Sequence, residues 1–235
     1  KKFYNYSQDI LKKNPDIKLV MASGRPFEMF QVGHFLKKKF DIIWIPDYRD
    51  EWNTHQNNEW NNNNIIRKYF SSIEKKSELK WTKNADYFIS VSKYWTESIQ
   101  DFINIPGHVV LNGYQSYSPL PNNSRKEVFR IVYAGTMYAA QPIEIFIEAI
   151  NQIVQNNRNP ELQIEVIFIG TENAIYGHQK LINLTKEYKH YKLLPRMNKE
   201  ELNIEISQCD LLFLTSFENV KGWYPVKLFE YYATG

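Results

Sequence analysis

Short apolar runs alternate with amphipathic stretches along nearly the whole sequence, and this alternation limits the fold more than any other feature. Runs such as Arg130–Ala134 and Ile164–Thr171 have the length of buried strands, and the stretches after them carry apolar residues at helical spacing. Because strands that alternate with helices form parallel sheets, the pattern predicts an α/β fold. It continues in both halves of the chain, so we expect two parallel-sheet domains with a ligand cleft between them.

The individual strands and helices follow from these runs. Strands are expected at Lys18–Ala22, Asp41–Pro46, Asn84–Ser92, Val109–Tyr114, Arg130–Ala134, Ile164–Thr171, Tyr191–Leu194 and Leu211–Leu214. Helices are expected at Lys1–Asn14, Met29–Leu36 and Ile65–Thr82, and after Pro142, Pro195 and Pro225. Proline is favoured in the first turn of a helix, which supports the starts near Pro142 and Pro225.

A stretch with few apolar residues divides the sequence. Gln115–Lys126 combines Pro119 and Pro121 with asparagine and serine, a composition typical of a linker. We therefore predict one domain over residues 1–117, a linker over residues 118–127 and a second domain over residues 128–235.

Composition excludes several classes of function. The 29 basic and 26 acidic residues give a net charge of +3, which is too small to predict a nucleic-acid partner. The single cysteine, Cys209, excludes an internal disulfide and a cysteine-based zinc site, and its apolar neighbours predict core packing. There is no run of about 18 apolar residues and no signal-peptide pattern, so we expect a soluble, cytoplasmic protein. Neither half contains G-x-G-x-x-G, which argues against a dinucleotide oxidoreductase.

Basic residues gather in one expected helix. Ile65–Thr82 and the nearby Lys37–Lys39 could face anionic lipid headgroups at the inner face of a membrane, as a peripheral contact. The alternative, which we prefer, is a helix face that water solvates. The basic residues of the helix are Arg67, Lys68, Lys75, Lys76 and Lys80.

The end of the sequence has the pattern of an anion-binding site. Leu211–Leu214 predicts a buried strand, and Pro225 predicts the first turn of a helix that continues toward Gly235. At such a strand-to-helix crossing, backbone N–H groups and the positive end of the helix dipole favour a diphosphate. Glu230 lies one turn into this helix among apolar neighbours, where a carboxylate needs a partner such as the vicinal hydroxyls of a sugar.

Two parts of the sequence resemble known enzymes. Thr215–Glu218 followed by Tyr224–Gly235 resembles the donor-site helix of the family 4 (group 1) retaining glycosyltransferases of the GT-B fold. Ser23–Phe27 and Trp44–Trp52 resemble the second half of their acceptor-binding domain. The resemblance implies two Rossmann-like domains, with acceptor binding in the first and donor binding in the second. It also implies retaining transfer of a hexose-type sugar from a nucleotide-diphosphate sugar to a glycan or lipid-linked acceptor, as in polysaccharide biosynthesis.

The resemblance assigns roles to residues of the second half. It places the ribose of the donor on Glu230, and it implies that Lys227, Arg196 and Glu218 act on the reacting sugar and the departing diphosphate. The family carries two glutamates with seven residues between them, whereas counting back from Glu230 reaches Gly222, so Glu218 fits only if its loop folds back. The implied donor-binding residues are Gly135, Thr136, Gly170, Met197, Tyr224, Pro225, Val226 and Glu230. Family members often carry an arginine and a lysine in the loop that here reads Gly135–Gln141, so Gly135 and Thr136 would act through backbone N–H and hydroxyl groups.

Charged residues at the end of an expected strand predict a second site. Asp47, Arg49 and Asp50 follow Asp41–Pro46, and open α/β sheets bind ligands at the carboxyl ends of their strands. The resemblance places these residues on the acceptor side. The alternative is that Arg49 and Asp50 pair with each other and cap loops. His34 is read either as an acceptor-site base or, preferably, as a packing residue on a helix.

Catalysis is expected to need neither a metal nor a cofactor besides the donor substrate. The chain has no Asp-x-Asp motif, so the ligands of a metal-bridged diphosphate are missing from the sequence. Two alternatives stay open: a nucleotide-sugar epimerase of the same fold, and a non-catalytic relative that binds a sugar nucleotide. The sequence starts within an expected helix and stops where a helix should lead into a strand. We therefore expect a piece of a longer enzyme, with both domains incomplete and little transferase activity by itself.

Overall fold

A computed structural model describes residues 2–54, 65–114, 127–156 and 163–234 of the chain, and the side chains from residue 68 onward in the second of these ranges. The chain forms two compact units. The first contains Lys1–Asn112 and Val220–Tyr224, and the second contains Gly113–Asn219 and Pro225–Gly235. The linker expected at residues 118–127 lies, apart from Glu127, outside the described residues.

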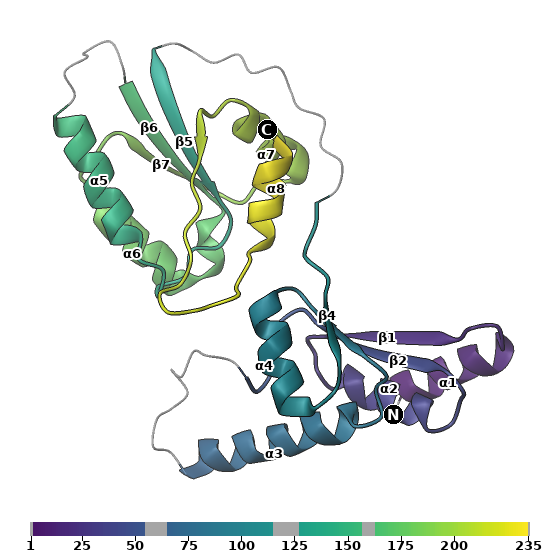
Figure 1. Cartoon of the computed structure of the whole chain (residues 1–235). Coiled ribbons are helices and arrows are strands. Elements are labelled where there is room, and N and C mark those ends of the chain that lie inside the picture. The colour runs from purple at the N-terminus through teal and green to yellow at the C-terminus, as the bar shows by residue number, and fades with distance from the viewer. Residues whose placement is uncertain (1, 55–64, 115–126, 157–162, 235) are drawn as a thin grey trace. The chain divides into compact units, whose positions relative to one another are not determined.

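The first unit is built on a parallel sheet with the strand order β1-β2-β3-β4. Its strands are β1 (Leu19–Gly24), β2 (Ile43–Tyr48), β3 (Phe88–Ser90) and β4 (Gly107–Val109). Its helices are α1 (Lys2–Lys13), α2 (Met29–Lys37), α3 (Ile65–Thr82) and α4 (Lys93–Ile103) (Figure 1). The order of the strands in the sheet repeats their order in the sequence, as expected for consecutive strand-helix units.

Large aromatic side chains fill the core of the first unit. Trp44 and Tyr48 of β2 and Phe30 of α2 are fully buried and pack with Phe88 of β3. Helix α2 approaches the sheet closely because Gly33 has no side chain: a Cβ there would lie 2.3 Å from the Trp44 ring. The regular apolar spacing of α2 therefore corresponds to one face that packs on β2.

The second unit contains a parallel sheet with the strand order β7-β6-β5-β8. Its strands are β5 (Val128–Ala134), β6 (Gln163–Ile169), β7 (Tyr191–Leu194) and β8 (Leu211–Leu212). Its helices are α5 (Ile143–Gln155), α6 (Ile175–Thr185), α7 (Lys199–Ser207) and α8 (Val226–Thr234), with a short 3-10 helix at Thr171–Asn173. The chain proceeds outward from β5 to β7 and then returns to place β8 on the other edge of β5. Such a reversal of strand order is where open α/β sheets bind ligands.

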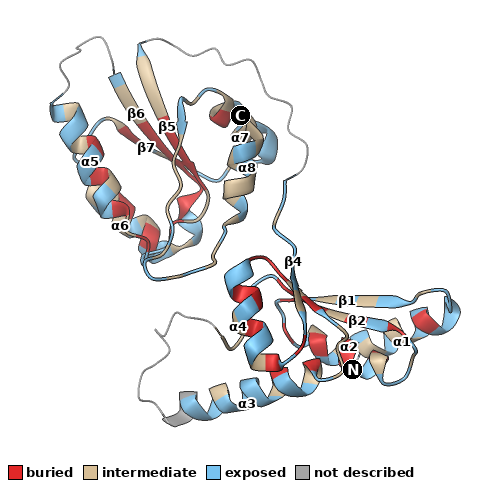
Figure 2. Cartoon of the chain, viewed as in Figure 1, coloured by how far each residue is buried: buried red, intermediate tan, exposed pale blue. Residues whose placement is uncertain are grey.

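Both faces of this sheet are covered. Ile131 and Tyr133 of β5 pack on the side of α5 and α6, whereas the alternate residues Val132 and Ala134 pack on the side of α7 (Figure 1). Burial on both faces explains why β5 reads as a continuous apolar run rather than an alternating one. The carboxyl-terminal halves of β5 and β6 are the most buried parts of the sheet (Figure 2).

The expected α/β class with parallel sheets is confirmed, and α3 and β7 have the predicted bounds. The strand predicted at Val109–Tyr114 is wrong, because β4 ends at Val109. Its partner β3 is also shorter than predicted: Ser92 caps α4 by accepting a hydrogen bond from the Trp95 N–H group, which turns the chain away from the sheet. With β3 limited to Phe88–Ser90, the pairing of β4 ends where Val109 lies opposite Ser90.

Cys209 is half-buried in an apolar cluster with Leu212 and Met197, and burial raises the pKa of its thiol to about 11. Core packing is therefore confirmed for this residue. Across the described ranges, no helix is both long enough and apolar enough to cross a bilayer.

Candidate functional site

The second unit contains a cavity of about 470 Å³ at the carboxyl ends of its strands. Its walls come from the loops after β5, β6 and β7 and from helices α7 and α8. The lining residues are Tyr114, Ala134, Gly135, Thr136, Ile169, Gly170, Asn173, Arg196, Met197, Lys199, Leu202, Asn203, Ile206, Lys227, Glu230, Tyr231, Ala233 and Thr234. The cavity lies where parallel sheets bind ligands, and its volume falls within the range of small-molecule sites.

Two glycines in the left-handed region shape the floor of the cavity. Gly135 follows β5 with a φ of 113°, and Gly170 follows β6 with a φ of 69°. A Cβ at Gly135 would lie 3.1 Å from both Cε and Nζ of Lys227, so a larger residue would displace that lysine. The Gly135 N–H group donates to the Ile169 carbonyl at 2.7 Å. The expectation that this amide would contact a phosphate is therefore wrong, and of this pair Thr136 keeps that role as a prediction.

Lys227 is a cation of the cavity whose pKa is shifted by burial. Its Nζ donates a 2.6 Å hydrogen bond to the Tyr133 hydroxyl and lies 3.9 Å from the centroid of the same ring. The Tyr133 hydroxyl in turn donates to the Thr136 carbonyl at 2.7 Å. Burial lowers the pKa of Lys227 from 10.5 to about 8, although the nearby Glu230 carboxylate opposes the shift. An anion bound in the cavity would therefore restore favourable interactions that Lys227 has lost by leaving water.

Helix α8 is placed against β5 by a tyrosine. The Tyr231 hydroxyl accepts a 3.0 Å hydrogen bond from the N–H group of Ala134, and burial raises the pKa of Tyr231 to about 12. Lys227 and Glu230 are one helical turn apart on the same helix, and both line the cavity. Glu230 is exposed rather than enclosed by its apolar neighbours in the sequence, so its carboxylate is accessible from the cavity.

The segment between β7 and α7 brings a second cation to the cavity. The Arg196 N–H group donates to Glu172 Oε1 at 2.7 Å, which holds this segment beside the loop after β6. Helix α7 then begins with a capping box, in which Asn198 and Glu201 each accept a hydrogen bond from the other's backbone. Arg196 and Met197, both predicted from the sequence, therefore lie at the cavity, with Lys199 on the first turn of α7.

The cavity also uses residues that the sequence analysis did not single out. They include Asn173, Lys199, Asn203 and Tyr231. The Asn198–Glu201 pair is a recognisable helix start, and it would have placed Lys199 at the positive end of α7. Nothing in the pattern marked Asn203, which reaches the cavity from the second turn of the same helix.

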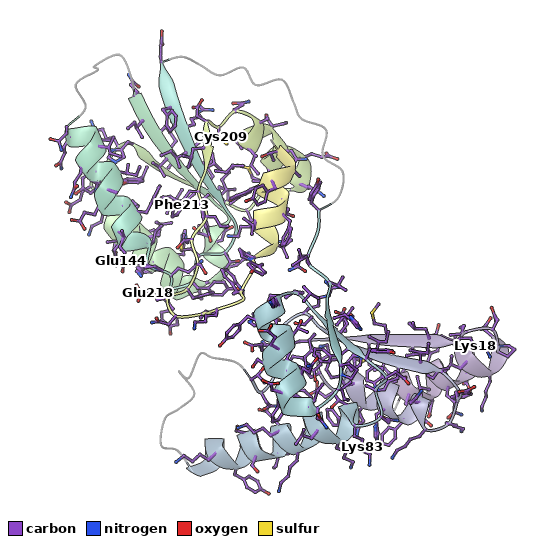
Figure 3. The ribbon with its side chains drawn as sticks, in the orientation of Figure 1. Lys18, Lys83, Glu144, Cys209, Phe213 and Glu218 are labelled. Atoms are coloured by element: carbon purple, nitrogen blue, oxygen red, sulfur yellow. The ribbon has the colours of Figure 1, made fainter. Side chains whose placement is uncertain are left out.

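Several predicted residues are not among those that line this cavity. Pro225 and Val226 precede or begin α8 without lining the cavity, and Tyr224 belongs to the first unit. Glu218 lies on the loop between β8 and α8 and is exposed (Figure 3). The structure therefore groups Lys227, Arg196, Glu230, Gly135, Thr136, Gly170 and Met197, and leaves Glu218 outside this group.

The predicted acceptor-side residues form ion pairs at the carboxyl end of β2. Asp47 is buried and accepts hydrogen bonds from the Ser23 hydroxyl at 2.6 Å and from Arg49 Nε at 2.9 Å. Arg49 also donates to the Asn112 side chain at 3.3 Å. The carboxylate of Asp50 lies 3.9 Å from Arg25. The alternative pairing of Arg49 with Asp50 is therefore wrong: each has a different partner.

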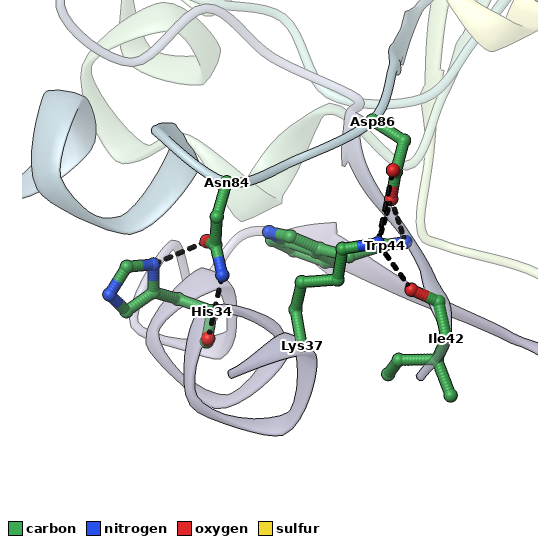
Figure 4. Close-up of polar contacts among 6 residues, drawn as sticks. All are labelled: His34, Lys37, Ile42, Trp44, Asn84 and Asp86. Carbon is green, nitrogen blue, oxygen red and sulfur yellow. Dashed lines mark hydrogen bonds and ion pairs between the residues drawn. The ribbon is translucent and has the colours of Figure 1, made fainter. Parts of the chain in front are cut away.

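Polar groups also organise the interior of the first unit (Figure 4). The ring of His34 is buried and hydrogen-bonded to the Asn84 side chain, and burial lowers its pKa. Lys37 is paired with Asp86, which also accepts a 2.8 Å hydrogen bond from the Trp44 N–H group. His34 is therefore a packing residue, which is the interpretation preferred from the sequence. Lys37 is paired with Asp86, whereas Lys38 and Lys39 are exposed.

A metal centre was not expected, and within the described ranges no three His, Cys, Asp or Glu side chains gather in a way that could hold a metal ion. No known family model and no curated protein sequence matches the chain.

Solved structures do match the chain. The apo structure of OtsA is similar over 98% of this chain and 58% of its own, with a TM-score of 0.66 and 11% identity. The α,α-trehalose-6-phosphate synthase from Burkholderia multivorans is similar over 93% of this chain and 55% of its own, with a TM-score of 0.60 and 9% identity. A Listeria monocytogenes protein described as a UDP-N-acetylglucosamine 2-epimerase is similar over 90% of this chain and 56% of its own, with a TM-score of 0.52 and 13% identity. The chain thus spans less than three fifths of these proteins.

These similarities, together with the two parallel four-stranded sheets, show that the chain has the GT-B fold. The predicted fold is confirmed at this level. Sequence identities near 10% show the fold alone and not the chemistry.

Proposed function

We propose that the cavity of the second unit binds a nucleotide-diphosphate sugar and that the protein is a retaining glycosyltransferase. The observation that carries the proposal is the grouping of Arg196, Lys227 and Glu230 around one cavity at a strand-order reversal. The two cations suit a diphosphate, and the carboxylate suits the vicinal hydroxyls of a ribose. The same-fold synthase from Burkholderia multivorans is named for a sugar-transfer product, which is consistent with this chemistry.

In this proposal Lys227 and Arg196 neutralise the charge that develops on the departing diphosphate, and Glu230 holds the ribose. Stabilising the leaving group in this way needs no metal. Met197 and the backbone around it would contact the nucleobase, and Thr136 would contact a phosphate. Asp47, Arg49 and Asp50 would serve the glycan or lipid-linked acceptor, with Asp47 and Arg49 held in place by each other. Peripheral contact with a membrane through α3 remains a further proposal, and nucleic acid is not proposed as a partner.

Calorimetry with UDP, GDP, ADP and their glucose conjugates tests the binding step directly. Saturable binding of at least one diphosphate that is strongly weakened by Glu230→Ala supports the proposal. Absence of binding for every nucleotide by the folded protein would contradict it. For any donor that binds, the anomeric configuration of a transferred sugar, read by NMR, then decides between retention and inversion.

A second candidate is a non-catalytic protein that binds a sugar nucleotide. It is favoured by Glu218, which is the acid proposed for the reacting sugar but is not among the residues lining the cavity. Tight donor binding without turnover, in the presence of varied acceptors, would select this candidate. Epimerisation, suggested by the similarity to the Listeria monocytogenes protein, would appear as a changed sugar on the nucleotide without any acceptor.

A further inference from the structure

Tyr133 of β5 does not line the cavity, but its hydroxyl contacts two residues that do, Thr136 and Lys227. The residue is fully buried, and its ring packs with Phe168 and Phe213. A phenylalanine would fill the same space without a polar atom, and a buried hydroxyl is costly unless it is hydrogen-bonded. Packing therefore explains the ring of Tyr133 and leaves its hydroxyl to be explained by the two contacts.

The loop after β5 orients this hydroxyl. The Tyr133 hydroxyl donates to the Thr136 carbonyl at 2.7 Å. Burial raises the pKa of Tyr133, so the hydroxyl keeps its proton at neutral pH. Because the proton points at the carbonyl, the lone pairs of the oxygen remain to accept a hydrogen bond. The Nζ of Lys227 donates this bond at 2.6 Å.

The Tyr133 hydroxyl holds the Lys227 ammonium without neutralising it. Within the described ranges, no other acceptor binds Nζ, and the Tyr133 ring adds a cation–π contact. An ammonium group has three N–H groups, so two of them remain for a ligand. A carboxylate in place of the hydroxyl would hold Lys227 as well but would cancel its charge. The neutral hydroxyl leaves that charge to an anion in the cavity.

The position of helix α8 does not depend on this hydroxyl. The Tyr231 hydroxyl of α8 accepts a 3.0 Å hydrogen bond from the Ala134 N–H group of β5. Strand and helix are thus connected by two hydroxyl contacts with different effects. Tyr231 binds the backbone of the strand and holds the helix, whereas Tyr133 binds the end of the Lys227 side chain. Loss of the Tyr133 hydroxyl therefore releases the ammonium group and leaves the helix in place.

We propose that Tyr133 is a positioning residue of the ligand site: its hydroxyl holds the Lys227 ammonium at the cavity, where the diphosphate of the ligand binds it. The proposal rests on the proposed function in taking a nucleoside diphosphate as the ligand. It goes further by assigning part of the affinity to a buried residue outside the cavity lining. Tyr133 acts on the ligand only through Lys227.

Tyr133→Phe keeps the ring and removes the hydroxyl. The dissociation constant for the nucleoside diphosphate that binds best, measured by calorimetry at pH 7, should rise about threefold to tenfold, as for one lost hydrogen bond. The hydroxyl also favours the charged form of Lys227, so the pH at which affinity falls should decrease by about one unit. In Lys227→Met, the same substitution should change the affinity by no more than about twofold, because the ammonium group is absent.

Other titratable groups near Lys227 stay in place in Tyr133→Phe. They are Tyr114, Arg196, Lys199, Glu230 and Tyr231. Their contribution to the pH profile is measured in Lys227→Arg, in which the titration of Lys227 is removed. Addition of Tyr133→Phe to Lys227→Arg should leave the pH profile of that variant unchanged. A shift in that background would assign the pH effect to another group and overturn the proposal.

Tyr191→Phe is the matched control. Tyr191 is buried in the same apolar cluster as Tyr133, and its hydroxyl is hydrogen-bonded to the Ile147 carbonyl at 3.1 Å and to the Asn151 side chain at 2.9 Å. None of these three residues lines the cavity. The control should lower the melting temperature and leave the affinity and its pH profile at the wild-type values. If Tyr133→Phe gives that same result, the hydroxyl of Tyr133 is merely structural and the proposal is overturned.

The contact is also testable without nucleotide. The free energy of unfolding should rise with pH between the pKa values of Lys227 in the folded and unfolded protein. Measured against the Lys227→Met form of each protein, this rise should begin about one pH unit lower in Tyr133→Phe than in wild type. If the wild-type protein binds no nucleoside diphosphate, the proposed function fails, and this measurement still decides whether Tyr133 holds Lys227. A rise that begins at the same pH in both proteins would overturn the proposal.

Discussion

The charged residues at the carboxyl ends of the two sheets differ in how their charges are satisfied. In the first unit, Asp47 is paired with Arg49, and Asp50 lies near Arg25. In the second unit, Arg196 and Glu230 form no ion pair among the described residues, and Lys227 contacts a tyrosine instead of a carboxylate. Charged side chains that pair with one another hold loops in place. Charged side chains that line a cavity without an ion-pair partner favour a charged, hydroxyl-bearing ligand. Mutations should therefore affect stability in the first region and ligand affinity in the second.

Glu230→Ala should produce the largest loss of nucleotide affinity. If the carboxylate accepts hydrogen bonds from both ribose hydroxyls, its removal costs roughly 2–4 kcal/mol. The dissociation constant, measured by calorimetry, should then rise by about 30-fold to 1,000-fold. Glu230→Gln should lose less, because the amide oxygen still accepts one bond at the same reach.

The competing interpretation of Glu230 is a purely structural carboxylate that caps a loop or pairs with a lysine. In that case Glu230→Gln would lower the melting temperature of the nucleotide-free protein and leave the affinity of the folded molecules nearly unchanged. Both quantities can be measured on one preparation. An unchanged affinity would remove the main support for the donor site.

Lys227 should give a smaller effect with a distinctive pH dependence. Its lowered pKa, about 8, means that the charged form becomes scarce above that pH, so diphosphate affinity should fall as the pH rises through about 8. Lys227→Met should weaken binding at pH 7 by about tenfold to a hundredfold, the range for charge-assisted hydrogen bonds. Lys227→Arg should keep the charge and remove the pH dependence near 8, because arginine does not lose its proton in this range. A pH profile shared by wild type and Lys227→Arg would contradict this assignment.

The same pKa predicts an opposite trend for stability. Because the pKa in the folded protein is lowered from 10.5 to about 8, the unfolded chain binds more protons between these values. The free energy of unfolding should therefore rise with pH across this window, relative to Lys227→Met. Urea unfolding of both proteins at pH 7, 8, 9 and 10, without nucleotide, measures the difference. A difference that falls or stays constant across the window would show that Lys227 is not desolvated.

The sequence predicted the fold because its signals are local. Apolar runs such as Tyr191–Leu194 contain all that is needed to recognise β7, and proline marked the start near α8. The strand at Val109–Tyr114 was misplaced because its end depends on a distant residue, Ser92, which caps α4 and shortens the neighbouring strand. Strand length in a parallel sheet is set by the partner strand, and a single run of residues does not contain that information.

The candidate site was predictable in part for the same reason. Lys227, Glu230, Gly135 and Gly170 belong to strand-turn-helix patterns and line the cavity, whereas the exposed Glu218 does not. Burial lowers the pKa of Lys227, and the contact of Lys227 with Tyr133, which is far away in the sequence, is not visible in a local pattern. The Lys221 carbonyl accepts a hydrogen bond from the indole of Trp95, more than a hundred residues earlier, and no pattern along the chain shows such a contact.

Arg49→Ala should lower the stability of the protein without weakening nucleotide binding, which is the clearest test of the difference between the two regions. Removal of Arg49 leaves the buried Asp47 carboxylate with the Ser23 hydroxyl, so the free energy of unfolding should fall by about 1–2 kcal/mol, discounted for the partial exposure of Arg49. Nucleotide affinity should change by no more than about threefold, because Arg49 is not a residue of the cavity. If an acceptor is found, its Michaelis constant should rise or turnover should be lost. Arg49→Lys is the matched control, since it keeps the charge next to Asp47. A collapse of nucleotide affinity in folded Arg49→Ala would show that the two regions are not separable.

Chelation should have the smallest effect of all. If Lys227 and Arg196 supply the positive charge that a diphosphate needs, a divalent ion is redundant, and EDTA should change the dissociation constant by no more than about twofold. In Lys227→Met, a magnesium ion from solution can replace the missing cation, so added magnesium should recover part of the lost affinity. The same addition should leave the wild-type affinity unchanged. Calorimetry on both proteins, with EDTA and with magnesium, gives the four values required. A wild-type affinity that collapses in EDTA and returns with magnesium or manganese would assign the diphosphate charge to a metal, and the cations of the cavity would need a different explanation.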